Sequence, residues 1–145
     1  MEIHTIGFTK KSAEEFFEAL KKAGIRRVVD IRLHNTSQLA AFTKRDDLAY
    51  FLKQILGAEY AHEPLLAPTE EILKGYKGKK IKWEDYERMF TKLLKERRVE
   101  STIDRKLFSV PAALLCSEAE PDKCHRRIAA EYLAEKWGGV KIIHL

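Results

Sequence analysis

The 145-residue chain contains no apolar run near the ~18 residues that a helix needs to cross a bilayer. Near its amino terminus, where a secretory signal would be apolar, stand the charged residues Lys10, Lys11, Glu14 and Glu15. We therefore expect a cytoplasmic protein without a membrane partner. Since domains usually span about 100–200 residues, a single domain over residues 1–145 is expected.

Cysteine and amide side chains are scarce. Two cysteines, Cys116 and Cys124, are too few for the disulfide framework of a small secreted protein, and a reducing compartment would keep both as thiols. One asparagine, Asn35, stands against 27 Lys and Arg and 22 Asp and Glu residues. Few thermolabile amides and many charges suit a heat-adapted host.

Positive charge is distributed unevenly. The chain has a net charge of +5 and a pI of about 9.2, whereas residues 74–106 alone hold 12 basic and 6 acidic side chains. An anionic partner, either a small molecule or a nucleic acid, is one interpretation of this basic segment. A solvated helix face that needs no partner is the other.

Strand-like and helix-like patterns alternate along the chain. Expected strands cover Ile3–Gly7, Arg27–Ile31, Glu59–His62, Val110–Cys116 and Lys141–His144. This alternation predicts an α/β fold, a three-layer domain whose mostly parallel sheet is flanked by helices. The domain is Rossmann-like, but the turn after the first strand, GFTKKS, lacks the glycine spacing of a dinucleotide fingerprint. No cofactor is predicted.

Helix signals lie between the expected strands. Ser12 and Glu15 form a capping-box pattern that opens the first helix. Asp46 or Asp47 is expected to cap a second helix. Its apolar face would consist of Leu48, Phe51, Leu52 and Ile55. Pro64 and Pro68 bracket an expected loop, after which a long amphipathic helix begins near Trp83.

Polar residues follow two expected strands and open the last helix. Asp30 and Arg32 leave the second strand, and Cys116 and Glu118 leave the fourth. Because open sheets of this class bind ligands beyond the carboxyl ends of their strands, we expect these side chains to meet. Strand order itself is not predicted.

The sequence DKCHRR opens the last helix. Asp122 is expected to cap it, which places Cys124 and His125 in the first turn. The unpaired backbone N–H groups there, together with Arg126 and Arg127, favour a thiolate or a bound phosphate.

Each of these residues has a structural alternative. The cysteines are also explained by burial, His125 by a hydrogen-bonded core position, and Asp30 with Arg32 by an ion pair. A reversible disulfide between the two cysteines is a further alternative. Zinc accepts these cysteines, His125 and His62, but the spacing is not that of a standard structural zinc site, so no metal is predicted.

The same residues carry a resemblance to a known family. TIGFTKKSAEEFF, VVDIR followed by Ser37 and Phe42, Tyr60 with His62 and Pro64, and ALLCSEAEPDKCHR resemble the family called domain of unknown function DUF488. Where many relatives have Leu-Gly-Gly after the proline, this chain has Leu-Leu-Ala, which affects only the expected shape of that loop. The resemblance implies an α/β domain and brings no established reaction.

Three functions are open on this basis. The first is an enzyme acting on an anionic, nucleotide-like or nucleic-acid-like substrate. Its catalytic residues would be Cys124, His125, Glu118 and Asp30. Its anion-binding residues would be Arg32, Arg126, Ser37, Cys116 and His62. The alternatives are a binding module without chemistry, using Tyr76, Trp83 and Tyr86 among the lysines, and a zinc- or thiol-redox-dependent protein.

Overall fold

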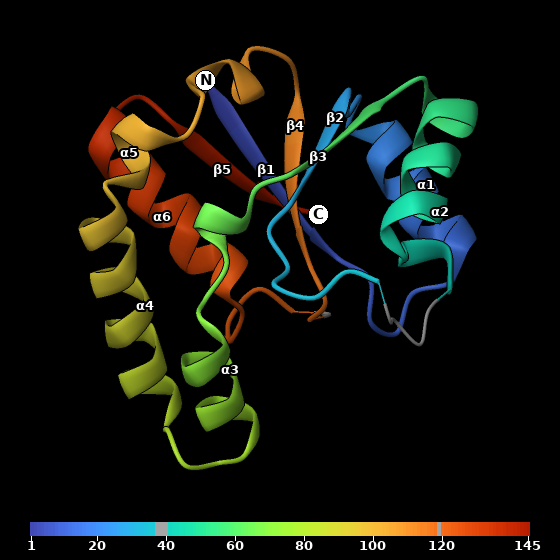
Figure 1. The fold of residues 1–145 in the computed structure, drawn as a ribbon. Helices are drawn as coiled ribbons and strands as arrows, with labels where there is room; N and C mark the ends of the chain where they lie inside the picture. Colours follow the sequence, from blue (N-terminus) through green and yellow to red (C-terminus); the bar gives the residue numbers. More distant parts are fainter. Residues whose placement is uncertain (37–40, 119) are drawn as a thin grey trace.

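A computed structural model describes residues 1–36, 41–118 and 120–145 of the chain. Strands and helices alternate as the sequence predicts (Figure 1). In chain order they are β1 (Glu2–Gly7), α1 (Ala13–Lys22), β2 (Arg27–Asp30), α2 (Arg45–Phe51), β3 (Glu59–His62), α3 (Glu70–Lys77), α4 (Trp83–Arg97), α5 (Val99–Thr102), β4 (Ala112–Cys116), α6 (His125–Trp137) and β5 (Lys141–His144). Among the described helices, none has the length and apolarity to traverse a bilayer.

The five strands form one parallel sheet in the order β3-β2-β4-β1-β5. Asp30 pairs with Leu115, and Gly7 pairs with Cys116. The carboxyl ends of β2, β4 and β1 therefore lie beside one another. The expected α/β fold with a parallel sheet is confirmed.

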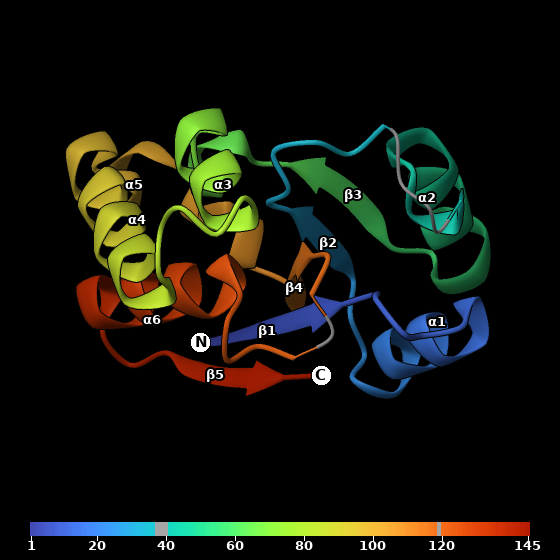
Figure 2. The same ribbon diagram turned by 90° about the horizontal axis from the view of Figure 1, so that it is seen from below.

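Helices cover both faces of the sheet (Figure 2). Helices α1 and α2 lie on one face and α3 to α6 on the other. Because side chains alternate along a strand, β4 supplies both cores: Leu115 packs with Phe16 of α1, and Leu114 packs in the core that contains Phe90 of α4. Cys116 belongs to the same core as Leu114 and so faces the α3–α6 side.

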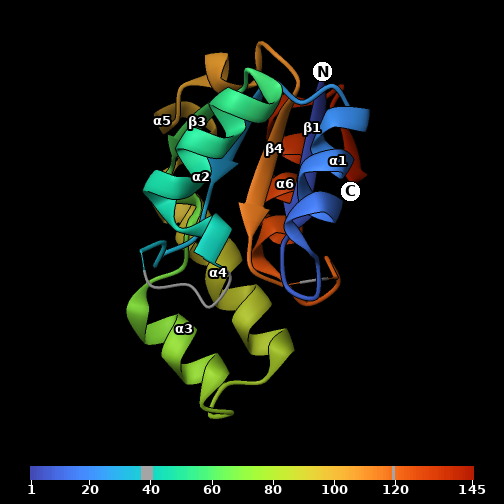
Figure 3. The same ribbon diagram turned by 90° about the vertical axis from the view of Figure 1, so that its right-hand side faces the viewer.

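The chain leaves β2 and β4 toward opposite faces of the sheet. After β2 it continues to α2, and after β4 it continues to α6. In open α/β sheets such a switch between neighbouring strands creates a crevice at their carboxyl ends. Helices α3 and α4 form a hairpin that extends beyond these carboxyl ends. It lies on the side to which the β4 arrow points (Figure 3).

Local predictions differ in their outcome. The capping box is confirmed, because the Glu15 N–H donates to Ser12 Oγ over 3.1 Å and the Ser12 N–H donates to the Glu15 carboxylate over 3.0 Å. The prediction that Asp46 or Asp47 caps α2 is wrong. Lys44 holds that position without a side-chain bond, since the Arg45 N–H donates to the Asn35 carbonyl and fixes where the helix begins.

Two further elements differ from their expected form. Ile55 is 49% exposed rather than buried, because a wider π-helical turn at Leu52–Leu56 rotates it away from the core. The expected strand Val110–Cys116 is shortened at its start, since Pro111 has no N–H to donate to a sheet.

Helix α3 was not predicted. Thr69 caps it by accepting the Ile72 N–H over 3.3 Å, and Glu70 and Glu71 fill its first turn. This Thr-Glu-Glu sequence is the signal that could have found it.

Candidate functional site

A cleft of about 120 Å³ opens at the carboxyl ends of β2 and β4, where the chain switches sides. Three parts of the chain form its walls: residues 32–34 after β2, residues 116–118 and 123–125 between β4 and α6, and the α3–α4 hairpin. The hairpin contributes Leu73, Tyr76, Lys77, Trp83 and Tyr86. Residues that follow β2, residues that follow β4 and the start of α6 thus line one cleft, whereas Asp30 is not part of its lining.

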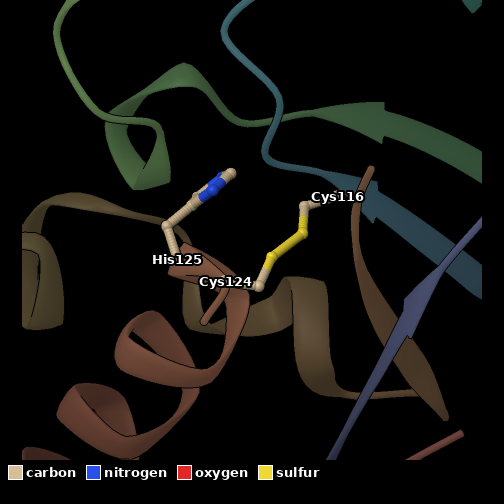
Figure 4. A group of neighbouring side chains, drawn as sticks. All are labelled: Cys116, Cys124 and His125. Atoms are coloured by element: carbon tan, nitrogen blue, oxygen red, sulfur yellow. A yellow bond between two sulfur atoms is a disulfide. The ribbon is translucent and has the colours of Figure 1, made fainter. Parts of the chain in front are cut away.

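Two cysteines line this cleft. Their side chains point toward each other (Figure 4). Cys116 ends β4, and Cys124 is the N-cap of α6, with extended backbone. Their sulfurs form a disulfide, which the sequence left as an alternative to free thiols. The prediction that Asp122 caps α6 is wrong. The Cys124 N–H donates to the Pro121 carbonyl, and this turn leaves Asp122 exposed ahead of the helix.

Arg126 lies behind the cysteines, in the first turn of α6. Its side chain is fully buried, and Nη1 donates to the Glu118 carbonyl over 2.6 Å and to Cys116 Sγ over 3.3 Å. Burial lowers the pKa of Arg126 to about 10, which still leaves the guanidinium charged at neutral pH. Arg126 therefore holds the loop after β4 and places a positive charge beside one sulfur.

Gly7 makes this arrangement sterically possible. A Cβ atom at this position would lie 1.6 Å from the Glu118 carbonyl oxygen and 2.8 Å from Arg126 Nη1. The loop thus crosses directly over the end of β1, where Thr9 donates its N–H and its hydroxyl to the Ser117 carbonyl. Any larger residue at position 7 would displace the loop that carries the cysteines.

His125 is the first residue of α6 and lines the cleft beside the disulfide. Its Nε2 lies 2.7 Å from the Ile31 carbonyl oxygen, which can only accept, so Nε2 carries the proton. Burial, reinforced by the charges of Arg126 and Lys77, lowers the pKa of His125 to about 4. The ring is therefore neutral near pH 7, and its Nδ1 keeps a lone pair.

A ring nitrogen of His125 and the sulfurs of Cys116 and Cys124 all lie within 4.8 Å of one another. We call these three residues the cysteine cluster. Cys116 and Cys124 are eight positions apart in the sequence and belong to different elements. The turn between β4 and α6, held by Arg126, is what brings them together.

Exposed charges surround the cleft. Lys77 and Lys123 contribute two cations to its lining, and Glu118 contributes one carboxylate. His34 also lines it, where its Nε2 lies 2.7 Å from a carboxylate oxygen of Glu70. The balance at the rim is positive, which favours an anionic ligand.

Three aromatic rings form one wall. Trp83 and Tyr86 are stacked with ring centroids 5.3 Å apart, and Tyr76 lies 4.8 Å from Tyr86. Tyr86 is buried, and its burial raises the pKa of its phenol, which stays protonated. These rings were considered either as a binding surface or as the core-facing side of a helix. Tyr86 packs in the core, as the second interpretation expects, and all three rings also line the cleft.

Asp30 belongs to a separate cluster. Its carboxylate is fully buried and accepts from Arg32 Nε and Nη2, each over 2.8 Å, and from the Tyr60 hydroxyl over 2.5 Å. Asn35 Nδ2 lies 3.4 Å from the same carboxylate. We call these four residues the Asp30 network. Burial, with the bond to Asp30 and its charge, raises the pKa of Tyr60, so the phenol remains a donor.

The nine predicted site residues thus divide into groups. Four of them line the cleft and come from β4, the loop after β4 and the start of α6: Cys116, Glu118, Cys124 and His125. Arg32 borders the cleft, but its guanidinium is bound to Asp30 and to the Thr43 carbonyl. The sequence had allowed for this ion pair.

The remaining predicted residues lie elsewhere. Arg126 is buried behind the wall, and His62, at the end of the edge strand β3, lies 3.0 Å through Nε2 from the Arg32 carbonyl oxygen. Ser37 lies outside the described residues.

The prediction missed Lys77 and Lys123 as cleft cations. Lys123 stands inside DKCHRR and could have been found there, whereas nothing local distinguishes Lys77 from other lysines of the basic segment.

A comparison with protein families gives one finding. The sequence pattern described as "Domain of unknown function DUF488" matches residues 12–133. The chain belongs to this family. DUF488 is the family that the motifs resemble, and its matched region contains the whole cysteine cluster and the Asp30 network. Neither the curated proteins nor the solved structures gave a match to this chain. Function must therefore be argued from the site.

Proposed function

We propose that this protein is an enzyme that acts on a small anionic substrate in the cleft, with the cysteine cluster as its reactive centre. The observation that carries the proposal is the convergence of Cys116, Cys124 and His125 with two cleft lysines at the switch between β2 and β4. Reactive sulfur, a neutral imidazole and cations around one concave site are the parts that such an enzyme requires.

Each part has a role in the proposal. Lys77 and Lys123 attract the anion, and the aromatic side chains of Tyr76 and Trp83 in the cleft lining suit a flat group such as a nucleobase. Once the disulfide is reduced, Cys124 supplies the thiol, as nucleophile or acid, and His125 Nδ1 can accept a proton. Glu118 is a second proton acceptor at the rim. In the reducing cytoplasm that we propose as the setting, the pair would be held as thiols.

The Asp30 network has a different role in this proposal. Among the described residues, Arg32, Tyr60 and Asn35 contact the Asp30 carboxylate, so in this proposal Asp30 and Arg32 shape the β2 side of the cleft. Arg126 acts in the same way on the β4 side, through the Glu118 carbonyl. In this proposal the anion is bound by the two exposed lysines of the cleft lining.

Calorimetric titration tests the binding half of the proposal. We expect saturable binding of pyrophosphate and of a nucleoside diphosphate, and no binding of the uncharged nucleoside. Lys77→Ala and Lys123→Ala should each weaken the affinity about five-fold, a loss of about 1 kcal/mol. Lys74→Ala is the matched control, since Lys74 is exposed on the same helix and stands outside the cleft lining. Equal affinities for all four proteins would overturn the proposal.

Alkylation of the reduced protein tests the reactive half. Iodoacetamide should modify Cys116 and Cys124 more slowly when pyrophosphate occupies the cleft, because the anion covers the sulfurs. Mass spectrometry of the peptides measures the extent at each residue. Modification at one rate with and without a bound anion would place the ligand away from the cysteines and contradict the proposal.

A binding module without chemistry is the second candidate. The stacked Trp83 and Tyr86, next to Lys77, favour it, because aromatic rings beside cations bind nucleotides and single-stranded nucleic acid. Such binding should weaken steeply with salt and should persist unchanged in Cys124→Ser. Retention of RNA or DNA by this variant, without any turnover by the wild type, would favour this candidate over the enzyme.

A further inference from the structure

The geometry points to a metal site: the cysteine cluster, once reduced, binds a zinc-type divalent ion through two sulfurs and one imidazole nitrogen. The inference rests on the proposed function, because it names the cofactor of the same reactive centre. With the ion bound, the two sulfurs and His125 Nδ1 would serve as ligands, and the open position of the ion would replace the free thiol as the reactive group. Three protein ligands would hold the ion, and the cleft would supply its open position. Two thiolates with one imidazole, plus an exchangeable ligand, is an established set for catalytic zinc.

Ligand placement supports this assignment. Zinc bonds of about 2.3 Å to sulfur and 2.0 Å to nitrogen place neighbouring ligands about 3.5–3.8 Å apart. The three candidate atoms already lie within 4.8 Å of one another. The Cα atoms of Cys116 and Cys124 are 7.5 Å apart, beyond the separation of about 4.4–6.8 Å usual for disulfides. The backbone therefore leaves room for the two sulfurs to separate around an ion.

The orientation of His125 is the second, independent observation. Histidines that ligate metals almost always donate their other ring N–H to a carboxylate or a backbone carbonyl, which fixes the tautomer. His125 does this, with Nε2 2.7 Å from the Ile31 carbonyl oxygen. Nδ1 is thereby left as the nitrogen with a lone pair. Phe90 packs against the same ring in a T-shaped arrangement, with centroids 5.6 Å apart, and helps to hold its plane.

The remaining surroundings suit an open site. Cys116 and Cys124 are 1% and 2% exposed, so the ion would be held at the buried floor of the cleft. Above it lies about 120 Å³ of space, enough for a few waters or for a donor atom of the substrate. Arg126 Nη1, 3.3 Å from Cys116 Sγ, is an outer-shell donor to a sulfur ligand.

Metal loading and disulfide formation exclude each other. A water-soluble phosphine reduces the disulfide by two electrons: the S–S bond breaks, each sulfur gains a proton, and the phosphine takes an oxygen from water to become its oxide. When the ion binds, each thiol releases its proton to solvent as a sulfur–metal bond forms, and the ion keeps its +2 charge. The site would therefore be loaded only in the reduced protein.

Anaerobic titration of the reduced full chain with Co²⁺ tests the inference. We expect one equivalent of Co²⁺ to produce the visible bands of a tetrahedral ion and the near-ultraviolet band of thiolate ligation, and Zn²⁺ to displace it. The oxidised protein, checked by its thiol content, should give neither band. Absence of both bands in a reduced sample with two titratable thiols would overturn the inference.

Variants show which residues bind the ion. Cys116→Ser and Cys124→Ser should lose the tetrahedral spectrum. His125→Gln should weaken Co²⁺ binding by at least ~10-fold. His34→Gln is the matched control, since His34 lines the same cleft outside the cluster, and it should bind as the wild type does. Circular dichroism establishes that each variant is folded. A folded His125→Gln protein with wild-type affinity would contradict the assignment of His125.

The two proposals can fail separately. If pyrophosphate does not bind but the cobalt spectrum appears, the metal site stands and the anionic substrate is wrong. If pyrophosphate binds and protects the thiols but no cobalt spectrum appears, the enzyme proposal stands without a metal. A change of the visible cobalt bands on addition of pyrophosphate would support both, because it would show the anion at the open position of the ion.

Discussion

Two polar clusters lie at the same edge of the sheet, and they differ in how their hydrogen-bonding groups are used. In the Asp30 network, Arg32 and Tyr60 converge on one carboxylate, which is fully buried. In the cysteine cluster, one imidazole nitrogen has a lone pair and the sulfurs line a cleft. A buried carboxylate whose partners are groups of the protein stabilises the fold, whereas an imidazole lone pair and sulfurs that line a cleft can act on a ligand.

Removal of the carboxylate of Asp30 should have the largest effect on stability. Asp30→Ala leaves the buried guanidinium of Arg32 without its counter-charge, and we expect the free energy of unfolding to fall by about 3–5 kcal/mol. Urea denaturation measures it. Glu59→Gln is the control, because Glu59 also pairs with an arginine, Arg27, but is 68% exposed, and its loss should cost about 1 kcal/mol or less. Equal losses would remove the distinction between the network and a surface ion pair.

Gly7→Ala should have the next largest effect and should reach the cysteine cluster. The added methyl group would collide with the Glu118 carbonyl, so the loop after β4 must move, at a cost of about 2–3 kcal/mol. Pyrophosphate and Co²⁺ binding should weaken together. Gly78→Ala, where the nearest atom to a new Cβ is 3.1 Å away, should leave both ligands unaffected. A Gly7→Ala protein that binds both ligands normally would show that the cluster tolerates displacement of the loop.

Tyr60→Phe should have a smaller effect. It removes one donor from the Asp30 carboxylate but leaves Arg32 in place, and we expect a loss of about 1.5–2 kcal/mol in the free energy of unfolding. Tyr50→Phe, at a site 61% exposed, is the control and should cost nothing measurable.

The same tyrosine predicts a dependence on pH. The pKa of Tyr60 is raised in the folded protein, so its contribution to stability is fully present below the unfolded pKa of about 10 and is lost as the pH rises toward the folded value. Urea denaturation at increasing alkaline pH should therefore show a steeper decline for the wild type than for Tyr60→Phe. Parallel declines would assign the alkaline loss to other groups.

Lys123→Ala should have the smallest effect on stability. Lys123 is exposed at the rim of the cleft, so the free energy of unfolding should change by no more than about 0.5 kcal/mol. Its affinity for pyrophosphate should nevertheless fall. Stability and binding would then separate at the rim of the cleft and coincide in the Asp30 network, where Asp30→Ala should impair binding only as far as it unfolds the protein.

The sequence determines much of this arrangement. Strand β4, the capping box of α1 and the block CSEAEPDKCHR could be predicted because each depends on neighbours along the chain: periodicity, a cap three residues away, or a dense local motif. The prediction that polar groups gather at the carboxyl ends of the strands followed from the alternation of strands and helices alone.

Other features depended on contacts between distant segments. The order of the strands, the bond from Arg32 to the Thr43 carbonyl, and the bond from His125 to the Ile31 carbonyl each join residues whose pairing the sequence does not show. Nothing local shows which groups of a charged or imidazole side chain will be satisfied internally. That is decided by what packs around it, because burial makes an unpaired polar group costly. Residue types thus indicate where chemistry is possible, and tertiary packing decides which of them keep a free lone pair.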